Sequence, residues 1–91
     1  MDDLQVIAIK LTEDPHSTKV AYKRRGRVFI RTGSDDFAVG KPLQGPVESL
    51  FGHLGYRAVQ NPPLFRDGAE LAQNIYGFEI VPGGKARYNQ N

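Results

Sequence analysis

Hydrophobic and polar residues alternate over the first third of the chain, which is the period of β-strands. The alternation runs through residues 4–12, 18–23 and 27–32. In the first stretch, one face is expected to hold Ile7, Ile9 and Leu11. The glycine between the second and third stretches is typical of a hairpin turn. The pattern therefore predicts three strands, the last two of which form a β-hairpin.

The register of this hairpin decides which side chains share a face. A two-residue turn pairs Arg24 with Arg27 and mixes apolar with cationic side chains. A three-residue turn ending at a left-handed Gly26 pairs Lys23 with Arg27 instead. It separates the cations and Phe29 from an apolar face formed by Val20, Tyr22, Val28 and Ile30. Because the slipped register would bury cations, we predict the three-residue turn.

The second half of the chain has helical and strand patterns in alternation. A helix after Pro46 is predicted by apolar residues at i, i+3, i+4 and i+7, namely Val47, Leu50, Phe51 and Leu54. Residues 56–60 can form the next strand. Asp67 and Glu70 have the spacing of a capping box, which favours a short helix over residues 68–75. Residues 78–81 are expected to form the last strand.

The resulting order, β-β-β-α-β-α-β, predicts a small α+β domain. Its sheet is expected to be mainly antiparallel, with about five strands and one or two short helices on one face. The sequence Pro82-Gly83-Gly84 ends the apolar pattern. We therefore expect one domain over residues 1–84 and a polar C-terminal tail over residues 85–91.

Composition narrows the class of protein. Hydrophobic residues make up 40% and charged residues 24% of the 91, which is ordinary for a globular domain. No apolar run approaches the roughly 20 residues of a membrane span, and the N-terminal MDDLQVIAIK lacks the basic region of a signal peptide. The absence of cysteine excludes disulfides, thiol catalysis and zinc–thiolate sites. These features favour a cytoplasmic protein.

Positive charge is concentrated in the predicted hairpin. The net charge is only +2, but residues 19–31 contain six Lys or Arg residues and no acid. Same-face residues on a strand repeat about every 7 Å, close to the phosphate spacing of a nucleic-acid strand. An exposed Phe29 could stack on an unpaired base. The candidate binding residues, which include two in the tail, are Lys19, Lys23, Arg24, Arg25, Arg27, Phe29, Arg31, Lys85 and Arg87.

No arrangement of residues predicts catalysis, a metal or a cofactor. His16 and His53 have no Cys, His or acidic neighbour at ligand spacing. The adjacent acids Asp35 and Asp36 point apart on an extended chain, and Asp67 is explained as a helix cap. Gly83-Gly84-Lys85 lacks the full spacing and the hydroxyl of a phosphate-binding loop. We therefore expect a non-enzymatic protein.

A local resemblance points in the same direction as the charge. The runs Val6-Ile7-Ala8-Ile9 and Arg27-Val28-Phe29-Ile30-Arg31-Thr32-Gly33-Ser34 resemble the strand and hairpin of the AlbA-type domain found in Schlafen-like proteins. The resemblance covers about a third of the chain. The resemblance slightly favours nucleic-acid binding as the function.

Three interpretations of the basic hairpin remain. The first is a non-catalytic module that binds nucleic acid or a nucleoprotein complex. The second is a small inhibitor or adaptor, such as those encoded by mobile elements, that docks on an acidic protein surface through the hairpin tip and tail. The third is a solvated sheet face without a partner, which is common in antiparallel sheets. Exposed edge strands would also permit a homodimer.

Overall fold

The computed structural model describes residues 3–13, 17–32 and 40–89. Their elements, in chain order, are β1 (Leu4–Lys10), β2 (Lys19–Arg24), β3 (Arg27–Thr32), β4 (Lys41–Pro42), α1 (Glu48–Gly52), β5 (Arg57–Gln60), β6 (Leu64–Phe65), α2 (Gly68–Gln73), a 3₁₀ helix η3 (Ile75–Gly77), β7 (Phe78–Ile80) and β8 (Ala86–Tyr88). The apolar segment predicted near Phe37 and the end of the hairpin at residues 33–36 lie outside the described residues.

The strands form one sheet in the order β4-β3-β2-β1-β5-β8-β7, and β6 pairs with β1 beside β5. All the pairs are antiparallel except β5 with β8. The predicted α+β class with a mainly antiparallel sheet is therefore confirmed. The described residues form eight strands rather than about five. The additional strands β4, β6 and β8 span only two or three residues each, too few to show a period.

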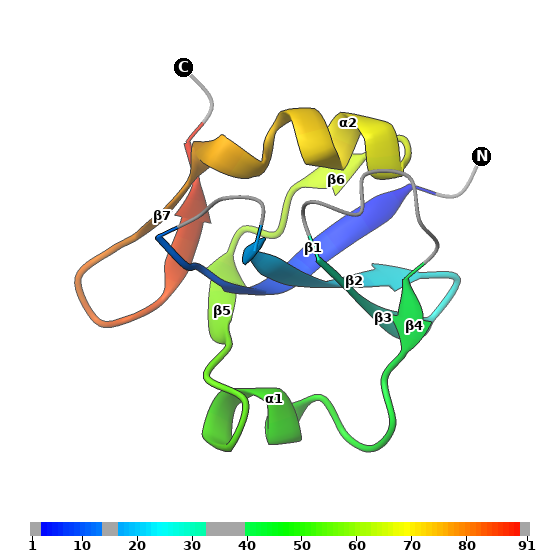
Figure 1. Cartoon of the computed structure of the whole chain (residues 1–91), viewed down its shortest axis with the longest axis horizontal. Coiled ribbons are helices and arrows are strands. Elements are labelled where there is room, and N and C mark those ends of the chain that lie inside the picture. The colour runs from blue at the N-terminus through cyan, green and yellow to red at the C-terminus, as the bar shows by residue number, and fades with distance from the viewer. Residues whose placement is uncertain (1–2, 14–16, 33–39, 90–91) are drawn as a thin grey trace.

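Both faces of the sheet are covered by helices. Figure 1 shows α2 on one side of the sheet and α1 on the other. The prediction that the helices share one face is therefore wrong. The reason is that the strands carry apolar side chains on both faces, and each apolar face needs its own cover. In the described residues the longest α-helix, α2, has six residues, so none could cross a membrane.

The hairpin register differs from the prediction. β2 and β3 pair Arg24 with Arg27 and Tyr22 with Phe29, so the turn contains only Arg25 and Gly26. The three-residue turn was predicted on the assumption that one face of the hairpin would be exposed to solvent. Because α1 and α2 cover opposite faces, apolar residues are needed on both. Val20 and Tyr22 therefore face α2, while the α1 side holds Ala21, Val28 and Ile30.

Strand β1 also departs from simple alternation. Its pairing with β2 shifts between Val6 and Ala8, which leaves Ile7 as the extra residue of a β-bulge. As a result Val6 and Ile9 belong to the α2-side cluster, whereas Ile7 and Ala8 belong to the α1 side. The predicted common face of Ile7 and Ile9 is wrong, because one inserted residue exchanges the faces of everything that follows it.

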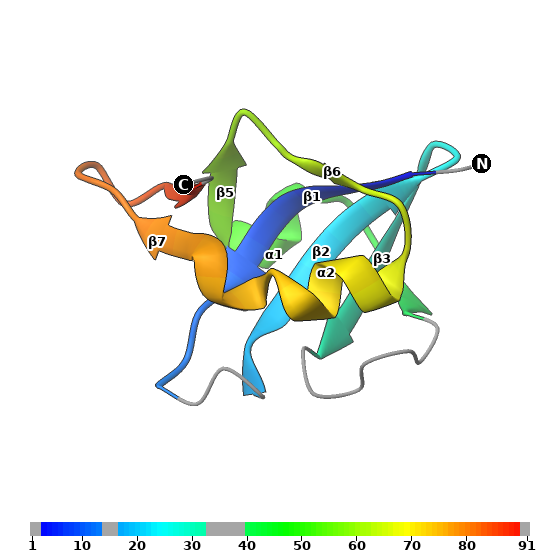
Figure 2. The same cartoon turned by 90° about the horizontal axis from the view of Figure 1, so that it is seen from above.

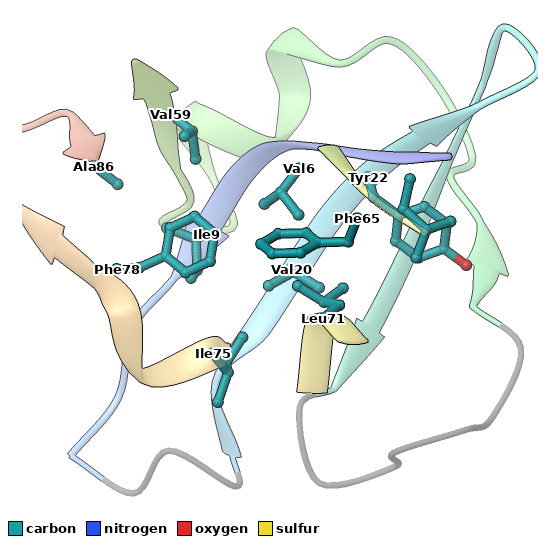
Figure 3. Packing of buried hydrophobic residues seen from close by; sticks show 11 residues of the cluster. Val6, Ile9, Val20, Tyr22, Val59, Phe65, Leu71, Ile75, Phe78 and Ala86 are labelled. Atoms are coloured by element: carbon teal, nitrogen blue, oxygen red, sulfur yellow. The ribbon is translucent and has the colours of Figure 1, made fainter. Parts of the chain in front are cut away.

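The larger core lies between the sheet and α2. It gathers buried side chains from six strands and from α2 and η3, and Figure 3 shows its packing. The members are Leu4, Val6, Ile9, Val20, Tyr22, Val59, Phe65, Leu71, Ile75, Phe78 and Ala86. The helix that supplies Leu71 starts at Asp67, whose carboxylate accepts a hydrogen bond from the Glu70 backbone N–H at 2.9 Å. This confirms the predicted cap, although α2 ends at Gln73 rather than near Ile75.

The smaller core lies under α1. Ala8 pairs with Ala21 on one side and Ala58 on the other, so small side chains leave room for Leu50 to reach the sheet. Leu50 is fully buried, and burial also raises the pKa of the Tyr56 hydroxyl. The predicted helix is confirmed in position but is short: Leu54 lies beyond its end, and Phe51 and Leu54 are both partly exposed.

The C-terminal segment is part of the sheet. β8 lies between β5 and β7, and Ala86 is completely buried. Tyr88 packs edge-on against Phe65, with ring centroids 5.4 Å apart, and donates a hydrogen bond from its hydroxyl to Asn74 Oδ1 at 2.7 Å. The predicted polar tail over residues 85–91 is therefore wrong over its described part. The strand Ala86–Tyr88 offers only one small and one aromatic apolar side chain, too weak a pattern to indicate a strand.

Candidate nucleic-acid interface

The hairpin turn is a tight two-residue connection at one end of the molecule. Arg25 and Gly26 both have positive φ values, 52° and 75°. Two consecutive residues with positive φ are typical of the type I′ turn, whose twist matches that of the flanking strands. Both views show the turn between β2 and β3, in cyan, projecting at the right-hand end of the fold (Figures 1 and 2).

The predicted binding residues do not share one face. Because of the two-residue turn, Lys19 and Lys23 lie on the α1 side of the hairpin, on the same face of β2 as Ala21. Arg27 and Arg31 lie on the α2 side, on the same face of β3 as Phe29. The continuous row of four cations expected to follow a phosphate backbone is therefore absent from the hairpin.

Two of the predicted residues are partly or fully covered by the rest of the protein. Arg31 is only 6% exposed and already has an interaction within the protein. Phe29 is half-buried and stacks on Tyr22, with ring centroids 5.6 Å apart and planes inclined by 25°. A Cβ at Gly40 would lie 2.6 Å from the Tyr22 hydroxyl oxygen and 3.1 Å from the Phe29 Cβ, so the chain before β4 packs closely against this pair of residues. Arg31 is therefore withdrawn from the surface, and Phe29 is engaged in packing rather than fully exposed.

The two C-terminal candidates are separated from the hairpin tip. Lys85 precedes β8, in the turn that connects it with β7. This turn lies at the left-hand end of both views (Figures 1 and 2). Arg87 is exposed, but its guanidinium binds the Glu79 carboxylate, with an Nε–Oε1 distance of 3.2 Å. The fold therefore does not bring Lys85 and Arg87 together with the basic hairpin.

Four cations remain together at the end of the hairpin, and we call them the tip cluster: Lys23, Arg24, Arg25 and Arg27. Lys23, Arg25 and Arg27 are exposed, while Arg24 is half-buried. Within the described part of the chain, no acidic side chain forms an ion pair with Lys23 or Arg27. The cluster is thus a compact group of positive charges at one end of the sheet, in which Arg25 also has an interaction within the protein.

The tip cluster lowers the stability of the folded protein. Arg24 and Arg27 lie directly opposite each other, and like charges in that position destabilise a strand pair. The Nε of Arg24 is buried and has no hydrogen-bond partner among the described residues. Arg25 adopts a left-handed conformation, which costs an ordinary side chain roughly 1–2 kcal/mol. Residues that break local rules in this way are typical of functional sites.

A substitution at Arg25 tests whether its left-handed conformation destabilises the protein. Arg25→Asn creates the Asn-Gly pair preferred in type I′ turns, so we expect stabilisation by about 0.5–1 kcal/mol in urea unfolding. Arg25→Lys keeps the charge and should leave stability nearly unchanged. If the asparagine variant were no more stable than the lysine variant, Arg25 would not be strained at this position.

The histidines and carboxylates considered for metal binding or catalysis lie partly inside and partly outside the described residues. Within residues 3–13, 17–32 and 40–89, no group of three His, Asp or Glu side chains gathers at metal-binding distance. His16 and the Asp35-Asp36 pair lie outside those residues. The sequence interpretation missed one further pair of cations: Lys10 faces Lys19 across β1 and β2, a contact that follows only from the strand register.

Known proteins offer no direct guide to the tip cluster. Comparison of the chain with protein-family models, curated proteins and solved structures finds no match in any of the three.

Proposed function

We propose that this protein is a non-catalytic binding module that holds nucleic acid, alone or in a nucleoprotein complex, through the tip cluster of its basic hairpin. The observation that carries the proposal is the grouping of four cations at a projecting turn, two of them directly opposed. Negative phosphates brought between them would relieve their mutual repulsion. The binding surface thus lies at the tip of the hairpin rather than on its face.

The test is the salt dependence of binding. Contacts from about four cations to phosphates should release counterions, so the logarithm of the affinity should fall with the logarithm of the salt concentration with a slope of about −3 to −4. The measurement is fluorescence anisotropy of a labelled oligonucleotide across a series of salt concentrations. A complex whose affinity does not change with salt would contradict binding through the tip cluster.

A second candidate is an inhibitor or adaptor that binds an acidic protein. It is favoured by Phe51 and Leu54, which are 39% and 43% exposed at the end of α1. A protein partner could bury both side chains, whereas a phosphate backbone gains little from them. A complex that survives nuclease treatment, and that is lost on Phe51→Ser/Leu54→Ser substitution, would support this candidate. A homodimer through the sheet edges at β4 or β7 also stays a prediction.

A further inference from the structure

The sheet is covered less completely by α1 than by α2. Among the described residues, the α2-side core holds eleven buried side chains, whereas the α1-side core holds four. The helix α1 spans only five residues, too few to cover the apolar side chains around it. Phe51 and Leu54, at its end, are exposed. Five more apolar side chains stay half-buried on this side, and with these two they form what we call the α1 face: Ile7, Val28, Ile30, Leu43 and Val47.

Two lysines border the α1 face on the hairpin side. Lys23 lies opposite Val28 in the β2–β3 pair, and Lys41 lies opposite Ile30 in the β3–β4 pair. Because directly opposed side chains in an antiparallel pair share a face, each lysine stands beside a half-buried apolar residue. The hydrogen bond from the Leu43 N–H to the Val28 carbonyl, at 2.9 Å, brings Leu43 alongside as well.

Two further lysines border the α1 face at the other end of β2. Lys10 and Lys19 lie directly opposite each other on the α1 side of β1 and β2. A Cβ at Gly55 would lie 3.7 Å from the Lys10 Cε, so the stem of Lys10 passes the chain directly after Leu54. All four lysines are exposed. The apolar surface is thus flanked by positive charge at both ends of the hairpin.

These four charges are not neutralised within the described part of the chain. None of the four lysines forms an ion pair there. Glu48 is the only acid on α1, and Glu79, on the same side of β7, is already paired with Arg87. An ammonium group on a flexible stem can meet a carboxylate without a fixed geometry, which suits a partner that presents acidic side chains.

The combination of an apolar centre and a cationic border selects the kind of partner. The phosphates of a nucleic acid would meet the lysines but gain little from the apolar side chains. A lipid bilayer takes up side chains that project from a surface, whereas most of those on the α1 face are half-buried. Apolar side chains of another protein can pack on them, and acidic residues around that contact would meet the lysines.

We propose that the α1 face is a second interaction surface, which binds an acidic amphipathic segment of another protein. The apolar side of the segment would bury Phe51 and Leu54, and its carboxylates would lie among the four lysines. The α1 face shares only Lys23 with the tip cluster, so this inference goes beyond the proposed function and does not depend on it. With both surfaces occupied, the protein would hold a nucleic acid and a protein together.

The probe is a labelled peptide of about 18 residues, with leucines at i, i+3, i+4 and i+7 and glutamates between them. A scrambled peptide of the same composition has the same charge but no apolar side. We expect the amphipathic peptide to bind at least about tenfold more tightly than the scrambled one in fluorescence anisotropy. Equal affinities would show attraction by charge alone and would overturn the inference.

Substitutions on the α1 face locate the binding. Phe51→Ser/Leu54→Ser changes no charge, and it should weaken peptide binding at least about tenfold while leaving oligonucleotide binding unchanged. Tyr76→Ser alters an exposed aromatic residue on η3, outside the α1 face, and should bind the peptide normally. Urea unfolding shows whether the variants are folded. Unchanged peptide binding by the folded double variant would contradict docking on the α1 face.

A charge variant keeps the inference testable if the serine variant does not fold. Lys10→Gln/Lys41→Gln leaves the apolar side chains in place and should weaken peptide binding several-fold. If this variant lost binding to phosphatidylserine vesicles but not to the peptide, the α1 face would be a lipid surface and the inference would be wrong. A protein that binds the amphipathic peptide but no oligonucleotide would refute the proposed function alone.

Discussion

Removal of residues 85–91 is expected to unfold the protein. The deletion takes away β8, which lies between β5 and β7, and so leaves both neighbours without a partner on that side. It also removes Ala86 from the core and the Tyr88 ring from its contacts with Phe65 and Phe78. Loss of a fully buried aromatic side chain costs about 3–5 kcal/mol, of which the half-buried Tyr88 contributes a part. The lost strand pairing adds to this cost, against a total stability of about 5–15 kcal/mol for a small domain.

The effect of the deletion on folding is measured by circular dichroism during urea unfolding. The truncated chain should lack a cooperative transition, while the full chain should have one. Arg87→Ala is the matched control within the same strand: its exposed ion pair with Glu79 should contribute no more than about 1 kcal/mol. Unfolding of the truncated chain at the same urea midpoint as the full chain would show that residues 85–91 are a dispensable tail after all.

Charge reversal at the hairpin tip should have the largest effect on binding. Lys23→Glu/Arg27→Glu removes two of the four tip cations and places two acids beside the phosphates. We expect affinity for the labelled oligonucleotide to fall about 100-fold at low salt and the salt slope to weaken to about −2. The hairpin should survive, because a carboxylate at position 27 would lie opposite Arg24 and replace a repulsion with an attraction.

Lys19→Glu/Lys85→Glu is the control for this prediction. It changes the net charge by the same amount, and both lysines are exposed. Lys19 is the first residue of β2, about 17 Å along the strand from the turn, and Lys85 lies at the other end of the molecule. Affinity should fall only a few-fold. Equal losses for the two double variants would point to attraction by the overall charge rather than to a site at the tip.

The elements predictable from sequence are those with a strong local pattern. Seven residues of alternating character were enough to indicate β1, and the Asp67 and Glu70 spacing was enough for the start of α2. Strands of two or three residues were not predictable, because β6 and β8 are stabilised by partners rather than by any pattern of their own. β8, for example, pairs with β5, from which it is separated by 25 residues of chain.

The candidate site was predictable in its location along the chain but not in its geometry. The basic segment was evident from residues 19–31, and four of the nine candidate residues do lie together at the tip. Phe29 and Arg31 were wrongly expected on the surface, because a single register step exchanges the faces of a strand. Lys85 and Arg87 were grouped with the hairpin only because residues 85–91 were taken for a tail.

By itself, the sequence determined the properties that depend on near neighbours: the strand periods, the turn at Gly26, the cap of α2 and the gathering of cations between residues 19 and 31. The tertiary structure decided the hairpin register, the bulge at Ile7 and the exposure of each cation. The physical reason is that α1 and α2 cover opposite faces of one sheet. Which side chains of the hairpin must be apolar therefore depends on helices that are separated from it by 15 or more residues of chain.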